Sequence, residues 1–180
     1  MVRYIFKIVL IGDGAVGKTS IRRRYMGEGF RTDFLATMGA DFAYLKTDTP
    51  DGDVIEWQIW DLAGQPAFRN VMKAYYKGSM GALAVYDVSQ PETLESIDSW
   101  TQDAQFYANT FSELPVVLVG NKIDLRDEIP NCTKTINGFA KAKTLNAEFI
   151  ETSAKTGENI DEAFMKLAHQ IIRKTNELDI

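Results

Sequence analysis

The sequence has little of the side-chain chemistry that disulfide frameworks and zinc sites require. Its 180 residues include one cysteine, Cys132, and one histidine, His169. A lone cysteine cannot form an intramolecular disulfide, and one cysteine with one histidine cannot supply the four ligands of a structural zinc site. We therefore assign both residues to structure and expect a reducing, intracellular compartment.

Long hydrophobic runs and targeting signals are also missing. No apolar run reaches the ~20 residues that a membrane-spanning helix needs. The start Met1-Val2-Arg3-Tyr4 has neither a signal-peptide core nor the Met-Gly of myristoylation, and residues 176–180 offer no cysteine for a prenyl group. The sequence predicts no intrinsic membrane anchor in this chain. We expect a cytoplasmic protein that reaches membranes peripherally, through a partner or a missing tail.

Positive charge is in deficit. Lysine and arginine number 20 against 25 aspartate and glutamate residues, which gives a net charge of −5. This balance disfavours binding to nucleic acid or to acidic lipid. No stretch rich in proline, glycine or serine divides the chain, and 45% hydrophobic residues make it too apolar for intrinsic disorder. The length predicts a single domain over residues 1–180.

The hydrophobic pattern alternates between strands and helices. Three short apolar runs are typical of parallel strands covered on both faces: Ile5–Ile11, Gly81–Val88 and Pro115–Val119. Helical periodicity follows a capping-box sequence at Ser89 to Glu92, and again behind Asn159. This alternation predicts the α/β class.

Two further strand-like runs break the alternation. Residues 40–47 and 54–61 flank a turn that contains Asp51 and Gly52, so we predict an antiparallel hairpin at the sheet edge. Ile55, Trp57 and Ile59 share the inward face. The period of two then places Trp60 on the opposite face, toward solvent or a partner.

A phosphate-binding motif follows the first predicted strand. Residues 12–19 read Gly-Asp-Gly-Ala-Val-Gly-Lys-Thr, the G-x-x-x-x-G-K-[ST] pattern in a strand–loop–helix context. The loop's backbone N–H groups and the helix N-terminus can cradle phosphate oxygens. Lys18 is expected to reach the β- and γ-phosphates, and Thr19 to bind Mg²⁺. The alternative, a glycine-rich turn without a ligand, is disfavoured by this context.

Two motifs later in the chain can read a base. Asn121-Lys122-Ile123-Asp124 and Thr152-Ser153-Ala154-Lys155 each follow a predicted parallel strand, where open α/β sheets bind ligands. Asp124 can accept hydrogen bonds from N1–H and the 2-amino group of guanine, and adenine offers neither donor there. A bidentate pair of this kind is worth roughly 1–3 kcal/mol of discrimination. The site is predicted to prefer guanine.

Together with residues 61–65, Asp-Leu-Ala-Gly-Gln, these motifs resemble the Ras-superfamily small GTPases over essentially the whole chain. Residues 37–42, 59–61 and 74–78 look Rab-like, whereas the phosphate loop looks Rho-like. The resemblance implies a P-loop NTPase fold of the Ras-like G-domain type. We expect a mostly parallel six-stranded sheet with one antiparallel edge strand and helices on both faces.

The resemblance also implies roles for individual residues. Thr37 would bind Mg²⁺ and the γ-phosphate, Asp61 would hold Mg²⁺ through water, Gly64 would sense the γ-phosphate, and Gln65 would orient the attacking water. The metal set is Thr19, Thr37 and Asp61, and the catalytic set is Gln65, Lys18 and Thr37. The nucleotide-binding set is Asp13, Gly14, Ala15, Val16, Gly17, Lys18, Thr19, Ser20, Phe30, Thr37, Gly64, Asn121, Lys122, Asp124, Ser153, Ala154 and Lys155.

Within that set, five residues are expected at the base. Phe30 would pack against it, Lys122 and Lys155 would lie along its faces, Asn121 would tie it to the phosphate loop, and the Ala154 N–H would read O6. The partner surface would comprise the two switch segments, around Thr37 and around Gly64, with Phe42, Trp60 and Tyr75, and it would meet effectors, exchange factors and GTPase-activating proteins. Aromatic residues on an edge hairpin can also cap a core, so that alternative stays open for these three.

The function implied is a monomeric, Mg²⁺-dependent switch that binds GTP and GDP and hydrolyses GTP slowly, in vesicle trafficking or signalling. Leu62 and Pro66 depart from the family pattern, and no catalytic arginine in cis is identifiable. Proline pushes the preceding Gln65 toward extended backbone. A pseudo-GTPase that binds nucleotide without cycling therefore stays open. An ATP-using phosphotransferase is disfavoured by Asp124 and by the lack of a lid domain.

Overall fold

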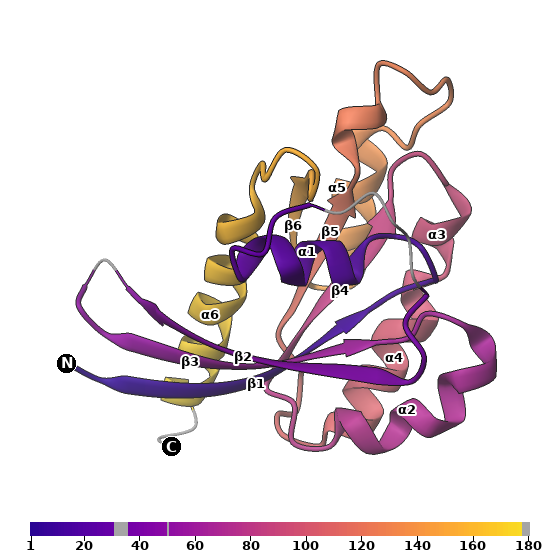
Figure 1. Cartoon of the computed structure of the whole chain (residues 1–180). Coiled ribbons are helices and arrows are strands. Elements are labelled where there is room, and N and C mark those ends of the chain that lie inside the picture. The colour runs from indigo at the N-terminus through magenta and orange to yellow at the C-terminus, as the bar shows by residue number, and fades with distance from the viewer. Residues whose placement is uncertain (31–35, 50, 178–180) are drawn as a thin grey trace.

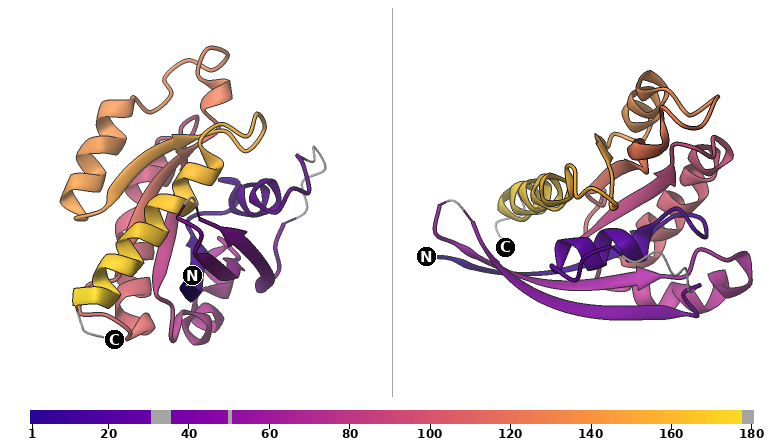
Figure 2. Two further views of the ribbon diagram at one scale, coloured as in Figure 1. Left: turned by 90° about the vertical axis from the view of Figure 1, so that its left-hand side faces the viewer. Right: turned by 45° about the horizontal axis from the view of Figure 1, so that its top comes forward.

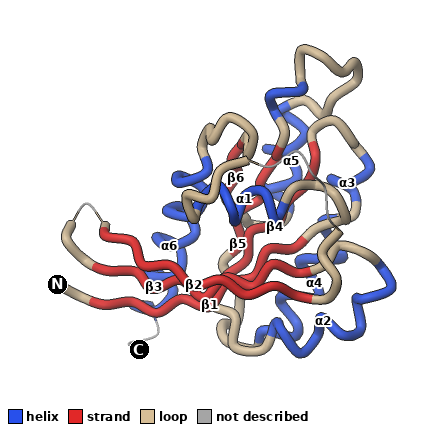
Figure 3. The backbone as a smooth tube through the Cα atoms, viewed as in Figure 1, coloured by secondary structure: helices blue, strands red, loops and turns tan. Residues whose placement is uncertain are grey.

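The computed structural model describes residues 1–30, 36–49 and 51–177. Six strands in this part of the chain form one sheet in the order β2-β3-β1-β4-β5-β6. They are β1 (Arg3–Ile11), β2 (Ala40–Asp48), β3 (Val54–Leu62), β4 (Gly81–Asp87), β5 (Val116–Asn121) and β6 (Glu148–Thr152). Only the β2–β3 pair among them is antiparallel. The sheet crosses the middle of the molecule (Figure 3), and the predicted sheet type is confirmed.

Helices cover both faces of this sheet (Figures 1 and 2). One apolar cluster joins the sheet to α1 (Lys18–Tyr25) and α6 (Ile160–Glu177). A second cluster on the other face joins it to α2 (Arg69–Tyr76), α3 (Glu92–Glu95), α4 (Ile97–Ala108) and α5 (Thr135–Thr144). Two short 3-10 turns, η1 (Pro66–Phe68) and η2 (Ile123–Leu125), precede α2 and follow β5. Every helix described is too short or too polar to traverse a bilayer.

The central strands explain why their sequences are so uniformly apolar. Every residue of β4 and of β5 is buried, because helices lie against both faces of these strands. The three strands predicted from apolar runs are confirmed, with ends that differ by one or two residues. The carboxyl ends of β1, β5 and β6 meet at one edge of the sheet, and the phosphate-loop motif and the two base-reading motifs follow directly from them.

The predicted hairpin is confirmed, and β2 is its edge strand. Ile55, Trp57 and Ile59 of β3 are fully buried, while Trp60 lies on the opposite face. Trp60 is not simply turned to solvent. Its ring lies between those of Phe42 and Tyr75, with centroids 5.0 and 5.2 Å away.

The capping prediction at Ser89 is wrong. Its hydroxyl and its N–H both donate to Asp87 Oδ1, at 2.6 and 2.8 Å, so this side chain does not cap the next helix. The helix is also divided at Ser96 into α3 and α4, and α3 has no side-chain cap. A carboxylate two residues upstream competes successfully for the serine hydroxyl. The start of α6 directly after Asn159 is confirmed.

Candidate functional site

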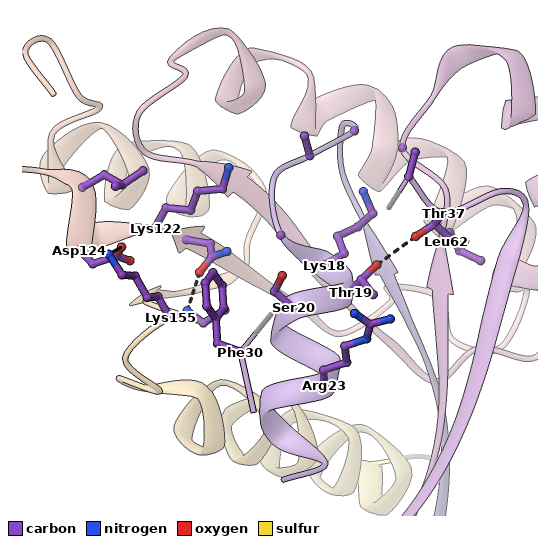
Figure 4. Close-up of a pocket in the computed structure, with 18 of the residues that line it drawn as sticks. Lys18, Thr19, Ser20, Arg23, Phe30, Thr37, Leu62, Lys122, Asp124 and Lys155 are labelled. Carbon is purple, nitrogen blue, oxygen red and sulfur yellow. Dashed lines mark hydrogen bonds and ion pairs between the residues drawn. The ribbon is translucent and has the colours of Figure 1, made fainter. Parts of the chain in front are cut away.

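A single pocket of about 560 Å³ brings most of the predicted nucleotide-binding residues together (Figure 4). It lies at the carboxyl ends of the central strands, between the phosphate loop and the loops that follow β5 and β6. Its lining includes Gly14, Ala15, Gly17, Lys18, Thr19, Ser20, Phe30, Thr37, Gly64, Gln65, Asn121, Lys122, Asp124, Ala154 and Lys155. Asp13, Val16, Asp61 and Ser153 are not part of the lining, and each supports it from behind.

The path of the phosphate loop depends on two glycines. Gly12 has φ +132°, and a Cβ there would lie 2.1 Å from the Val85 carbonyl oxygen. Gly17 has φ +102°, and its Cβ would lie 2.3 Å from Asn121 Nδ2. No other residue type fits this backbone at such close approach. The loop is therefore pressed against β4 and β5.

Lys18 is folded back into this loop. Its Nζ donates to the carbonyl oxygens of Gly12 at 2.7 Å and Asp13 at 2.6 Å, and the residue is 6% exposed. Burial lowers the pKa of Lys18 to about 8, and the carboxylates of Asp61 and Asp13 oppose that shift. Burial of the charged ammonium group of Lys18 costs desolvation free energy, and an anion bound beside it would offset that cost.

This pKa predicts proton uptake when nucleotide binds. Phosphate oxygens beside Lys18, where the sequence predicts them, would favour its charged form and would raise its pKa above the value of about 8 in the free protein. The complex then holds more protons than the free protein, and affinity falls as pH rises above about 8. Calorimetric titration with GDP in two buffers of different ionisation enthalpy is expected to show uptake at a pH of about 8.5 and little at about 7. Equal uptake at both values would contradict the assignment.

Three oxygen-bearing side chains converge below the loop. Thr19 Oγ1 donates to Asp61 Oδ2 at 2.5 Å and lies 3.0 Å from Thr37 Oγ1 (Figure 4 marks the latter contact). Asp61 is fully buried, burial raises its pKa, and its Oδ1 has no hydrogen-bond partner among the described residues. A buried acceptor of this kind fits a ligand from outside the chain.

The donor set suits Mg²⁺ in particular. It offers one carboxylate and two hydroxyls, all hard oxygens, and Mg²⁺ commonly takes its remaining ligands from phosphates and water. No cluster of three or more His, Cys, Asp or Glu side chains that could hold a metal occurs in the described part of the chain. These residues therefore do not form the kind of metal site in which protein carboxylates supply most of the ligands.

Asn121 connects the two halves of the pocket. Its Nδ2 donates to the Val16 carbonyl oxygen at 2.9 Å. Its Oδ1 accepts from Thr152 Oγ1 at 3.1 Å and from the Ala154 N–H at 3.2 Å. The phosphate loop and the loop after β6 are thus joined through one side chain. Because Ala154 N–H already donates here, its expected contact with guanine O6 stays a prediction.

Asp124 is held at the opposite end of the pocket from Lys18. Its Oδ1 accepts from Ser153 Oγ at 2.5 Å, and Lys155 Nζ lies 3.9 Å from its Oδ2. Lys122 is anchored by a buried carboxylate, because its Nζ lies 2.6 Å from Asp87 Oδ2. These contacts orient the three charged side chains without any ligand.

Sequence reasoning missed several residues of the site. Five more line the pocket: Arg23, Gly29, Ala36, Leu62 and Leu125. Arg24 supports it, since its guanidinium donates to the carbonyl oxygens of Ala154, at 2.9 Å, and Lys155. Arg23 and Arg24 follow the phosphate loop within one to two helical turns, and this closeness in sequence could have marked both arginines as site residues. Nothing local indicates a contact between residues 130 positions apart.

The chain is similar in sequence to known proteins over nearly its whole length. The family model described as the Ras family matches residues 7–173. The Ras-related protein RABE1e of Arabidopsis thaliana is 39% identical over 176 residues, which cover 98% of this chain and 79% of that protein. The Ras-related protein Rab-8B of Homo sapiens is 39% identical over 173 residues, which cover 96% of this chain and 81% of that protein.

Proposed function

Because the chain belongs to the Ras family and is a small GTPase, a GTP-binding molecular switch, we propose that the pocket described above is its nucleotide site. Residues 1–180 would form one G domain. The resemblance to Rab proteins leads us to propose a role in vesicle trafficking. The observation that carries the site assignment is the convergence of Lys18, Thr19 and Asp124 in one pocket, with Asp61 hydrogen-bonded to Thr19 behind its wall.

The proposed division of labour follows from what each group can donate or accept. Lys18 exchanges its two carbonyl partners for phosphate oxygens, and the loop N–H groups bind the same anion. Thr19, Thr37 and Asp61 would hold Mg²⁺, which when bound neutralises charge on the phosphates. Gln65, exposed on the pocket wall, would orient the attacking water.

Hydrolysis by the isolated protein is expected to be far slower than one turnover per second. Gln65 precedes Pro66, which restricts the backbone that must carry the glutamine over the water; the side chain of Pro66 lies outside the described part of the structure. Related enzymes gain about 10³ to 10⁵ in rate from an arginine supplied by a helper protein. Single-turnover phosphate release from GTP-loaded protein measures the rate, and rapid unaided hydrolysis would contradict this expectation.

The nucleotide that copurifies with the protein tests the site assignment directly. Guanine nucleotide, followed by conversion of added GTP to GDP in the presence of Mg²⁺, is the expected result. An adenine nucleotide would overturn the proposed role of Asp124. The proposed catalytic roles of Gln65 and Thr37 would be wrong if bound GTP persisted unchanged over hours.

We also propose a protein-binding surface formed by Phe42, Trp60 and Tyr75. The three rings lie in a row, tilted by 52° and 41° to one another, and Phe42 is 47% exposed at the end of that row. Large aromatic side chains at a partly exposed sheet edge suit a protein interface. Effectors, exchange factors and GTPase-activating proteins are the partner classes. The chain would act as a monomer in the cytoplasm that meets membranes peripherally.

A further inference from the structure

Arg22 is a buried arginine that faces the proposed metal site from α1. The residue is 6% exposed. Its Nη2 donates to Asp41 Oδ2 at 2.7 Å, and its Nε lies 3.9 Å from Asp61 Oδ2. Arg22 stands three positions after Thr19, so one turn of helix presents the threonine hydroxyl and the guanidinium to the same side. Neither Arg22 nor Asp41 is among the residues predicted for the site.

The two carboxylates that Arg22 contacts are cross-strand neighbours. Asp41 of β2 and Asp61 of β3 are paired in register in the antiparallel ladder. Like charges directly opposite each other destabilise such a pair. Asp61 is fully buried, whereas the Asp41 side chain is 55% exposed, so repulsion acts on a carboxylate that water cannot screen. A fixed cation between the two strands removes that repulsion.

Arg22 therefore lies beside Asp61, the carboxylate that the proposed function assigns to Mg²⁺. Asp61 Oδ2 receives the Thr19 hydroxyl and lies beside the guanidinium, and Oδ1 has no hydrogen-bond partner in the described chain. A guanidinium stays charged at any physiological pH. Unlike a bound metal ion, it cannot dissociate from the protein. Its charge opposes a second cation at Asp61 and compensates the carboxylates when that cation departs.

We propose that Arg22 is a positioning residue that lowers the affinity of the site for Mg²⁺ and holds β2 against β3 when the metal is absent. This inference rests on the proposed assignment of Mg²⁺ to Thr19, Thr37 and Asp61. Its consequence is a nucleotide that is released more readily at a given Mg²⁺ concentration than it would be without Arg22. The residue acts through Asp61 and Asp41 and not on the nucleotide.

The test is the free-Mg²⁺ dependence of release of a fluorescent GDP analogue. Removal of the charge in Arg22→Met is expected to shift the midpoint to lower Mg²⁺ by about tenfold, since one competing cation is lost. Arg22→Lys keeps a charge and is expected to stay near the wild-type midpoint. Arg3→Met is the matched control, because Arg3 also pairs with a buried carboxylate, that of Glu56, away from the pocket.

Thermal unfolding supplies a second readout that does not depend on turnover. Arg22→Met is expected to lose more stability in chelator than in Mg²⁺, because Asp41 and Asp61 then have neither cation. Should that variant fail to fold, Asp41→Asn carries the test with the opposite sign. In Asp41→Asn, Asp61 is the remaining carboxylate beside Arg22, so the guanidinium competes more strongly with Mg²⁺. The midpoint of nucleotide release is therefore expected to move to higher Mg²⁺.

The outcomes separate the inference from the function on which it rests. Mg²⁺-dependent release in the wild type, with an unchanged or raised midpoint in Arg22→Met, would overturn the role of Arg22 alone. An equal shift in Arg3→Met would overturn it as well, since the effect would then follow net charge. Release that ignores Mg²⁺ in the wild type would overturn the metal assignment together with the role of Arg22.

Discussion

Asp124→Asn is expected to turn a guanine site into a xanthine site. Asparagine replaces one acceptor oxygen with an NH₂ donor, which meets the 2-amino group of guanine donor to donor. Xanthine carries a carbonyl oxygen at that position, so the same NH₂ finds an acceptor while the amide oxygen still accepts from N1–H. We expect GTP affinity to fall by about ten- to a hundredfold or more, the range of a bidentate base contact, and xanthosine triphosphate to bind in its place.

The surroundings of Asp124 make this a change in recognition more than in folding. Ser153 Oγ donates to Oδ1, and an asparagine oxygen can accept the same bond. Asp127→Asn is the matched control, since Asp127 lies three residues further along, is exposed and does not line the pocket. Competition binding with GTP and xanthosine triphosphate measures the preference. Unchanged GTP preference in Asp124→Asn would refute the proposed base recognition.

Gly64→Ala is expected to reduce GTP hydrolysis by about a hundredfold or more. A Cβ on Gly64 would lie 2.2 Å from the Asp13 carbonyl carbon and 2.4 Å from the Gly14 nitrogen. Both atoms belong to the backbone of the phosphate loop, so the segment that carries Gln65 has to move away from it. A displacement of about 1 Å at reacting groups can cost on the order of 10²-fold in rate.

This defect should be confined to hydrolysis. GDP affinity is expected to change little, because the base contacts and Lys18 lie on other segments. Gly52→Ala is the control for loss of a glycine: Gly52 has φ +82° in the β2–β3 turn, and its Cβ would meet nothing within 4 Å. Single-turnover hydrolysis decides the matter, and a rate within a few-fold of wild type in Gly64→Ala would contradict the prediction.

The sequence predicted those parts of the site whose chemistry is local. Residues 12–19 form a phosphate loop because glycine spacing, lysine and threonine act within one turn of chain. The position of Asp124 in the pocket could be predicted because the motif of residues 121–124 directly follows a parallel strand. The alternation of Ile55, Trp57 and Ile59 likewise fixed which face of β3 is buried, and the structure confirms it.

The remainder depends on relations that a linear pattern does not encode. Arg22 contacts both Asp41 and Asp61 because α1 packs beside two strands whose register sets these carboxylates opposite each other. Ser89 matched a capping pattern, yet Asp87 two residues earlier was a better partner in the folded backbone. Trp60 was predicted to face solvent or a partner, and it lies half-buried between the rings of Phe42 and Tyr75, which come from separate segments. Each case required the tertiary arrangement of groups that compete or cooperate.

The link between Arg24 and the loop after β6 has a consequence for how the protein is made. Arg24 donates to the Ala154 carbonyl oxygen, and Asn121 donates to that of Val16, so both bonds join the earliest segments to late ones. Translation adds about 5 to 20 residues per second, and the phosphate loop therefore leaves the ribosome seconds before its partners exist. During that interval the phosphate loop lacks Val85 and Asn121, the two residues against which its glycines pack. If the proposed base contacts of residues 121–155 hold, we expect nucleotide to stabilise this fold fully only after residue 155 has emerged.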